Sequence, residues 1–589
     1  MTGTIRFAFG LQGAVSAAMA LLIAVYLTKF YVDVVALPAG VMALAIAAGR
    51  AFDAITDPLM GWLSDRTRSR FGRRMPYIAI GVLGNTAMFV LLLNPPEQLP
   101  DVGLAGWAVA ALLLSFLFLT ISAVPRQALA MELTQDQGHR QDLFAAIAGF
   151  VAIGTIVGAV MPNVLAGMGI EDGREQMFWQ SMIYGGAYLA ANIVFLLVIR
   201  EPRIDAARGR TPLVPGVRRA LRNRAFRITF VSHVITAIPF AIPATMLPFY
   251  TQHVLKAEDV WVGYFLLAYL LSGLMALPIW LIVAHAKGKR VVWLSASAIA
   301  VVGGAALFFA GPGDERLVLF IHMMVGLQSA VWLFVGGAMH ADVVDYDELL
   351  TGKRREAQFA ALWSIIPKFA LIPGASIPLA VLGSVGYVPD APAQSADVVF
   401  TIKTMHALLP ATLNAIGLGL MWWYPLSEAR HAAVQRAVQA QAQGKAVVDP
   451  VIGTTLPPPQ SRAVSDDVAW QLDYFSPNEL AHMAEGGWRR VSAALATRIA
   501  AWGVLSVALL ASVVPQLGAL DQDPGALPAL TIVLAGLTLT ASLFHAARAP
   551  ALWRMRRAPM SPAIVLAHLE SVAPQAPATM RLRVASVVQ

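Results

Sequence analysis

The chain has 589 residues, of which 57% are hydrophobic and only 13% are charged, and its formal net charge is +8. Soluble proteins carry about 25% charged residues, so this composition excludes an ordinary soluble protein and indicates a polytopic membrane protein. Most basic residues lie in short loops between apolar runs, so the net charge does not predict nucleic-acid binding. The chain has no cysteines, which excludes disulfides and thiolate chemistry.

Apolar runs of about 20 residues, the length that a helix needs to cross a hydrocarbon core, recur along the chain. They predict an all-α protein with two sets of six spans and a C-terminal two-helix transmembrane hairpin, fourteen spans in all. The first six are 8–28, 39–63, 76–94, 104–128, 143–166 and 178–199. The second six are 227–251, 259–285, 290–310, 317–340, 359–385 and 402–424, and the hairpin is 494–516 and 528–547.

Arginine and lysine gather in the 2–3 loop, the central break and the 8–9 loop, whereas loops at the other end are acidic or nearly uncharged. By the positive-inside rule, both termini of this multi-pass protein are expected in the cytoplasm, with the spans in the cell inner (plasma) membrane.

The same features predict the domain organisation. The segments are an N-terminal six-helix bundle (1–199), a basic cytoplasmic central loop (200–226), a C-terminal six-helix bundle (227–428), a cytoplasmic tail and linker (429–475), and a short helix with the extra hairpin (476–589). The short helix is expected to start at a capping box formed by Ser476 and Glu479, and to end at Gly486-Gly487.

Three ionisable residues share one helical face in the second span. Arg50, Asp53 and Asp57 are spaced i, i+3 and i+7 within an apolar run. Ionisable groups within a membrane are costly and by default mark an ion or substrate path. The alternative is a structural salt bridge that pins neighbouring helices.

Three motifs, RAFDAITDP, VPRQALAMELT and HADVVDYDELLTGKRRE, are spread over both halves of the chain. Together with twelve spans and the 2–3 loop, they resemble the glycoside–pentoside–hexuronide:cation symporter family of the major facilitator superfamily, which includes melibiose permease. The resemblance covers about residues 5–425 and implies the major facilitator fold for the two six-helix halves.

The resemblance also implies a cation site. Its ligands would be Asp53, Asp57, Thr56 and Thr120, and Arg50 and Lys368 would couple the site to the rest of the transport cycle. Carboxylates and hydroxyls suit Na⁺ or Li⁺, and a carboxylate pair can instead carry a proton. The coupling ion, Na⁺ or H⁺, stays open. No other metal and no cofactor is expected.

Charged residues in the 2–3, 4–5 and 10–11 regions suit ion pairs that open and close the cytoplasmic side. The candidates for this gate are Asp65, Arg66, Arg73, Glu132, Asp342 and Asp345. The alternative for each of them is solvated surface charge.

The corresponding part of span 1 and the stretch of span 4 before Pro125 lack the carboxylates that grip sugar hydroxyls in the family. The substrate-binding candidates are therefore Gln12, Tyr26, Arg126, Gln127, Trp332 and His340, with Lys29 and His406 as further cavity-side residues. Arg126 favours an anionic group because of its planar fork of donors, or else it pairs with Glu132.

These observations predict a cation-coupled secondary transporter that imports a sugar, glycoside or uronate by alternating access, and not an enzyme. Alternatives are a cation-coupled carrier of a lysolipid or other anionic amphiphile and, more remotely, a non-transporting membrane scaffold or a polytopic membrane enzyme. The expected partners are a small-molecule substrate, the coupling cation and membrane lipid. The oligomeric state is left open.

Overall fold

The computed structural model describes residues 3–67, 69–133, 137–201, 213–331, 335–352, 359, 363, 373–389, 391, 393–458, 464–517, 527–557 and 560–572. The N-terminal half contains α1 (Gly3–Leu21), the π-helical turn η1 (Leu22–Tyr26), α2 (Leu27–Lys29), the π-helical turn η2 (Phe30–Val34), α3 (Ala39–Arg66), α4 (Met75–Leu93), α5 (Asp101–Glu132), α6 (Gln137–Gly167) and α7 (Gly173–Val198). The short helix α8 (Leu213–Arg222) leads into the second half.

The second half contains α9 (Arg224–Phe249), the π-helical turn η3 (Tyr250–Val254), α10 (Val260–Lys287), α11 (Lys289–Leu307), α12 (Glu315–Ala330), α13 (Gly336–Thr351), α15 (Ala396–Lys403), the π-helical turn η5 (Thr404–Leu408) and α16 (Leu409–Trp422). The remainder contains α17 (Glu428–Ala442), strands β1 (Val447–Val448) and β2 (Thr455–Leu456), α18 (Asp466–Leu472), α19 (Pro477–Ala484), α20 (Trp488–Leu517), α21 (Leu527–Ala546), α22 (Ala549–Arg557) and α23 (Pro562–Val572).

Within the described residues, ten helices are long and apolar enough to cross a membrane. Helix α3 adds a shorter apolar stretch, Ala39–Arg50. Residues 360–362 and 364–372 of the predicted span 359–385 lie outside the described residues, and 373–384 is helical. The chain is thus a multi-pass membrane protein.

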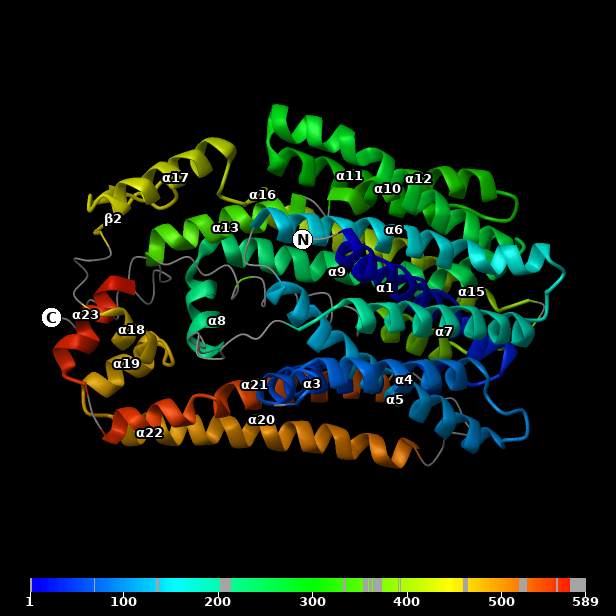
Figure 1. The fold of residues 1–589 in the computed structure, drawn as a ribbon, viewed down its shortest axis with the longest axis horizontal. Helices are drawn as coiled ribbons and strands as arrows, with labels where there is room; N and C mark the ends of the chain where they lie inside the picture. The colour runs from blue at the N-terminus through cyan, green and yellow to red at the C-terminus, as the bar shows by residue number, and fades with distance from the viewer. Residues whose placement is uncertain are drawn as a thin grey trace.

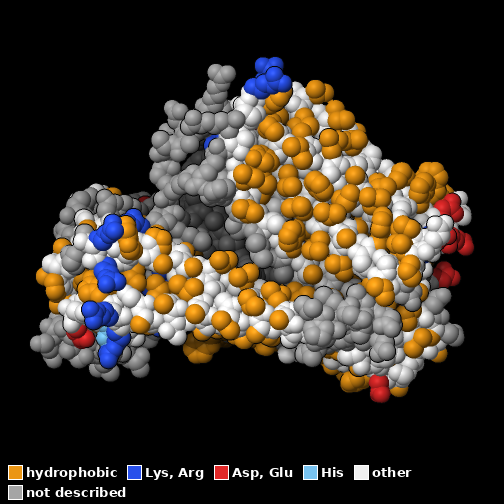
Figure 2. Space-filling model, turned by 90° about the horizontal axis from the view of Figure 1, so that it is seen from below, with side chains coloured by type: hydrophobic (Ala, Val, Ile, Leu, Met, Phe, Trp, Pro, Cys, Tyr) orange, Lys and Arg blue, Asp and Glu red, His pale blue; other side chains and the backbone are white. Residues whose placement is uncertain are grey.

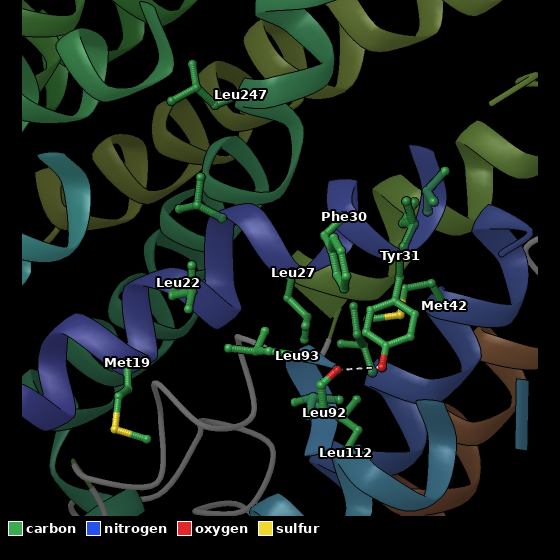
Figure 3. Close-up of a cluster of buried hydrophobic side chains, with 14 of the residues drawn as sticks. Met19, Leu22, Leu27, Phe30, Tyr31, Met42, Leu92, Leu93, Leu112 and Leu247 are labelled. Atoms are coloured by element: carbon green, nitrogen blue, oxygen red, sulfur yellow. Dashed lines mark hydrogen bonds between the residues drawn. The ribbon is translucent and has the colours of Figure 1, made fainter. Parts of the chain in front are cut away.

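The two halves repeat the same packing. In the first half α3 packs on α5, α5 on α4 and α4 on α7, and in the second half α10 packs on α12, α12 on α11 and α11 on α16. Tyr31 at the end of the first span donates a 2.6 Å hydrogen bond to the carbonyl of Leu92 (Figure 3), and Tyr250 donates an equivalent 2.6 Å bond to the carbonyl of Leu307. The internal repeat explains why six plus six apolar runs form two similar bundles.

The two ends of the molecule differ in charge. We call the end with Arg73 of the 2–3 loop, α8 and Lys289 of the 8–9 loop the basic end, and the end with Asp33 and Asp259 the acidic end. Figure 2 shows hydrophobic side chains spread across the body of the molecule, with Lys and Arg side chains gathered on its left part and Asp and Glu side chains along its right edge. A broad apolar face between charged ends suits a bilayer.

The C-terminal hairpin packs on the first half of the chain. Helices α20 and α21 lie side by side, and Ser506 on α20 donates a 2.9 Å hydrogen bond to the carbonyl of Ala535 on α21. Helix α21 packs against α3, and Figure 1 shows the orange and red helices running along that side of the molecule. Exposed residues such as Val504 and Val507 leave the outer face of α20 apolar.

The capping box that the sequence predicts is present. The hydroxyl of Ser476 accepts from the backbone amide of Glu479, whose carboxylate accepts in turn from the Ser476 amide, and α19 starts at Pro477. The helix ends at Ala484, and Gly486 has a positive φ of 80°. This glycine ends the helix because residues with a Cβ rarely adopt that conformation.

The interpretation of 429–475 as a tail and linker is corrected by the structure. Besides the expected helix α17, this segment contains the β1–β2 hairpin and α18. Helices α18, α19, α22 and α23 and the start of α20 pack around a common core with Leu472, Phe475 and Leu569 at its centre. We call this unit the C-terminal module. Its core forms between segments about 100 residues apart, which local patterning does not reveal.

Candidate functional site

The ionisable face of α3 is directed toward α5. Gly49 allows the two helices to approach closely, because a Cβ at this position would lie 2.7 Å from the Phe116 ring. On α5, Phe116 and Thr120 are spaced i, i+4 and so share one face. Arg50, Asp53 and Asp57 therefore contact residues of α5.

A single hydroxyl connects the two carboxylates of this face. Thr120 Oγ1 lies 2.6 Å from Asp53 Oδ1 and 3.1 Å from Asp57 Oδ1, and the Thr120 side chain is buried. A threonine hydroxyl has one proton to donate, so it cannot give each carboxylate a full hydrogen bond. A proton on one carboxylate or a nearby cation would balance the charge of this pair.

The other predicted members of this site are placed as follows. Thr56 is buried, and its hydroxyl bonds the carbonyl of Asp53 at 3.3 Å, so it supplies a further oxygen beside the pair. The guanidinium of Arg50 stacks over Phe116 at 4.7 Å, and Arg50 Nε has no hydrogen-bond partner among the described residues. Phe116 was not foreseen from sequence, although its spacing to Thr120 was available there. Lys368 lies outside the described residues.

Among the described residues, the predicted substrate residues make hydrogen bonds to different partners. Gln12 is buried and donates to Ser16 at 2.6 Å, whereas Tyr26 donates to the carbonyl of Ala159 at 3.3 Å. Arg126 is buried and contacts Asn192 at 3.4 Å. Gln127 is exposed.

His340 lies in an aromatic stack toward the basic end. Its ring stacks on Trp363 at 4.8 Å, and Trp363 stacks on His233 at 4.1 Å. Trp332 lies outside the described residues. His406, one of the two further cavity-side candidates, lines a cavity of about 220 Å³ that lies mainly within the second half of the chain and reaches the first.

Three of the predicted gate residues form ion pairs within the described part of the chain. Asp342 accepts from Lys289 Nζ at 2.6 Å, Asp345 accepts from His431 at 3.0 Å, and Arg73 binds Glu201 at 3.2 Å. Asp65, Arg66 and Glu132 belong to helices, but their side chains lie outside the described part. Pairing between the halves at the basic end stays a prediction for another state.

At the acidic end, ion pairs and hydrogen bonds join the halves. Lys29 on α2 binds Asp259 at 2.7 Å, and the hydroxyl of Tyr387 contacts both Asp33, at 2.7 Å, and His253, at 3.0 Å. Sequence reasoning had selected only Lys29. The residues that meet at the acidic end are far apart in the sequence. The only sequence feature that indicated this contact was the acidic loop that contains Asp259.

Residues 8–428 match the family described as MFS/sugar transport protein. The chain belongs to this family. Two relatives illustrate its range: the glucuronide carrier protein homolog of Escherichia coli is 24% identical, with 69% of this chain and 88% of the relative covered. The sodium-dependent lysophosphatidylcholine symporter 1 of Gallus gallus is 22% identical, with 70% and 85% covered.

The fold agrees with this membership. The crystal structure of the D-xylose-proton symporter matches with a TM-score of 0.52 at 14% identity and covers 72% of this chain and 97% of its own. The protein is a membrane transporter of the MFS/sugar transport family, and not an enzyme. The family match ends at residue 428, so the C-terminal module and hairpin lie beyond it.

Proposed function

We propose that the protein is a cation-coupled symporter that imports a sugar-type substrate, a sugar, glycoside or uronate, with Na⁺ or H⁺ bound between α3 and α5. The observation that carries this proposal is the contact of the Thr120 hydroxyl with both Asp53 and Asp57. Two carboxylates and a hydroxyl form a set of hard oxygen ligands, which is suited to Na⁺ and equally able to hold a proton. The names of the relatives support symport and sugar-type substrates.

Alternating access follows from the two-half architecture. The contacts at the acidic end close that side, while the ion pairs named at the basic end stay within one half. We assign the basic end to the cytoplasm, so this state faces inward. The same assignment includes fourteen spans with both termini cytoplasmic, in the inner (plasma) membrane.

A cation-binding test does not need the substrate. Purified protein in nanodiscs is heated with Na⁺, Li⁺ or K⁺ across a range of pH. An ion that binds the folded state raises Tm, and the gain in stability is about 2.7 kcal/mol at 100 times Kd. We expect Na⁺ or H⁺ to stabilise the wild type, and we expect Asp57→Asn and Thr120→Val to lose that response.

Thr86→Val is the matched control, because the Thr86 hydroxyl bonds the Val82 carbonyl of its own helix. If every variant responds as the wild type does, the assigned ion site is wrong.

Uptake into proteoliposomes tests coupling directly. Labelled glycosides, uronates and lysophospholipids are offered with an imposed Na⁺ or proton gradient, and with neither. We expect accumulation driven by one of the two gradients in the wild type and no gradient-driven accumulation in Asp57→Asn. A wild type that accumulates no tested substrate under either gradient contradicts the proposal.

A topology test exploits the absence of cysteine. Single cysteines are placed at Phe71 in the 2–3 loop and at Met168 between α6 and α7, both of which are exposed. A membrane-impermeant reagent added to cells should label the cysteine at 168 and spare the one at 71. The reverse pattern would contradict the assignment of the basic end to the cytoplasm.

A further inference from the structure

The cavity of about 220 Å³ lies mainly within the second half of the chain and reaches the first. Its walls come from α9, α10, α11, α12, η5 and α16, with Leu21, Ala24, Val25 and Thr155 added from the first half. Because it spans the boundary between the halves, relative motion of the halves changes its shape. We call it the C-half cavity.

Most of its lining is apolar. The hydrocarbon side chains include Leu247, Leu266, Leu270, Leu307 and Val325, with Pro239, Phe240 and Pro243 from α9. Among the described lining residues there is no Asp, Glu, Lys or Arg. A buried carboxylate or phosphate would find no opposite charge in this wall, and burying an unpaired charge is costly. The cavity therefore suits an uncharged, largely apolar group.

Several polar groups in the wall are already bonded within their own helices. Thr155 donates to the carbonyl of Val151 at 2.8 Å, Thr236 to that of Ser232 at 2.9 Å, and Ser329 to that of Gly326 at 2.8 Å. The His322 ring contacts the Val318 carbonyl at 2.9 Å. A free sugar, which presents several hydroxyls, would leave many of them without a partner here.

His406 is different. Its side chain is only 2% exposed, and neither Nδ1 nor Nε2 has a hydrogen-bond partner among the described residues. The ring stacks on Tyr250 at 4.4 Å, which fixes its plane, and it lies in the π-helical turn η5. Such turns are frequent at functional sites. A neutral imidazole offers one donor and one acceptor on different sides of the ring, and a hydroxyl can pair with either one of them.

We propose that the C-half cavity holds the apolar group of an amphiphilic substrate, with His406 hydrogen-bonding one uncharged polar group, such as a hydroxyl or ether oxygen, next to it. The inference rests on the proposed transport function and narrows its substrate class to molecules with an apolar arm. That arm is either the alkyl or aryl aglycone of a glycoside or the acyl chain of a lipid, and the experiment separates these two sources.

The test measures binding of n-alkyl β-glucosides, from methyl to hexyl, to the full chain in nanodiscs, with glucose and lysophosphatidylcholine as competitors. We expect affinity to rise about fourfold per added methylene, the factor given by about 0.8 kcal/mol for each buried methylene. Competition by lysophosphatidylcholine would identify a lipid chain as the source, and its absence a glycoside aglycone. Glucose binding as tightly as hexyl glucoside would overturn the proposal.

Two variants separate the apolar wall from the polar anchor. Ala300→Leu narrows the cavity and should flatten the dependence of affinity on chain length. His406→Phe keeps a ring against Tyr250 and removes both nitrogens, so it should weaken every glucoside by about 5- to 100-fold, as expected for a polar group left unpaired. The gain per methylene should be kept in His406→Phe.

His285→Phe is the matched control, because His285 lies at the exposed end of α10. Unchanged chain-length dependence in Ala300→Leu would overturn the assignment of the cavity. The cation-dependent Tm is recorded for the same samples. If the chain-length dependence is present but Na⁺ and H⁺ have no effect on Tm, the proposed coupling fails while the assigned cavity stands. If the ion effect is present without chain-length dependence, the cavity assignment alone fails.

Discussion

Lys29 Nζ on α2 lies 2.7 Å from the carboxylate of Asp259, just before α10, and this ion pair joins the two halves of the chain at the acidic end. Asp259 is largely exposed, so the pair by itself contributes little, about 0–1 kcal/mol. The neighbouring contacts of Tyr387 with Asp33 and His253 are more buried and add to it. Together they hold the acidic end closed.

Weakening these contacts should shift the protein toward the state that is open at the acidic end. We expect Lys29→Ala to change the population ratio by no more than about fivefold and Lys29→Ala/Tyr387→Phe to change it further. Spin labels on cysteines at Val34 and Val388, both exposed, report the distance between the halves. Their distance distribution should gain a longer component in the double variant. Identical distributions in wild type and double variant would contradict this role.

The geometry of Thr120 predicts different outcomes for two substitutions. Thr120→Ser keeps the hydroxyl between the carboxylates and should keep cation-dependent transport, whereas Thr120→Val keeps the side-chain shape and loses the hydroxyl. Loss of one hydrogen bond to charged groups is worth about 1.5–3 kcal/mol. The cation concentration for half-maximal uptake should therefore rise by about one to two orders of magnitude in Thr120→Val. Equal behaviour of the two variants would mean that the hydroxyl has no part in ion binding.

The C-terminal module is attached to α8 by buried ion pairs. Asp473, with a side chain only 1% exposed, binds Arg219 and, at 2.7 Å, Arg222, both on α8. Asp473→Asn should destabilise the module by about 3–5 kcal/mol, because it leaves buried arginines without their charge partner. Hydrogen exchange should then accelerate in α18, α19 and α23. Glu485→Gln, at an exposed position, is the control. Unchanged exchange in Asp473→Asn would show that the pairs do not hold the module.

The module should also lose stability in acid. Burial would raise the pKa of Glu479, but hydrogen bonds from Arg548 and the Ser476 amide outweigh it and lower this pKa to about 2. Since the folded-state pKa is depressed, the contribution of Glu479 is present above its ordinary value of 4.5 and is lost as pH falls toward 2. Exchange in α19, corrected for the intrinsic pH effect, should rise over this window in the wild type and stay flat in Glu479→Gln. If exchange in α19 of the wild type does not change over this pH window, Glu479 does not stabilise the module as predicted.

Helix α17 should respond to pH in the opposite direction. The hydrogen bond to Asp345 raises the pKa of His431 above its ordinary value of 6.5. Protonated His431 therefore stabilises the contact of α17 with α13 at pH values below 6.5, and this contribution is lost as pH rises through the raised pKa. Corrected exchange in α17 should increase as pH rises above 6.5 in the wild type. In His431→Gln the increase should vanish, and its persistence would assign the effect to another group.

The sequence by itself determined that this is a multi-pass membrane protein, because hydrocarbon requires about 20 apolar residues for each span and the chain shows such runs directly. Ten helices of this kind are present among the described residues. It also determined that Arg50, Asp53 and Asp57 share a face, which follows from helical periodicity, and that α19 begins directly after its N-cap Ser476, which follows from local capping chemistry.

The tertiary structure decided which groups these residues meet. That Thr120 bridges Asp53 and Asp57, that Lys29 meets Asp259, and that Asp473 binds α8 all depend on contacts between segments distant in the chain. No local pattern encodes such contacts, because they arise only when helices pack against each other. For the same reason, sequence reasoning could select His406 as a cavity-side residue but could not show that both of its nitrogens are buried and have no hydrogen-bond partner among the described residues.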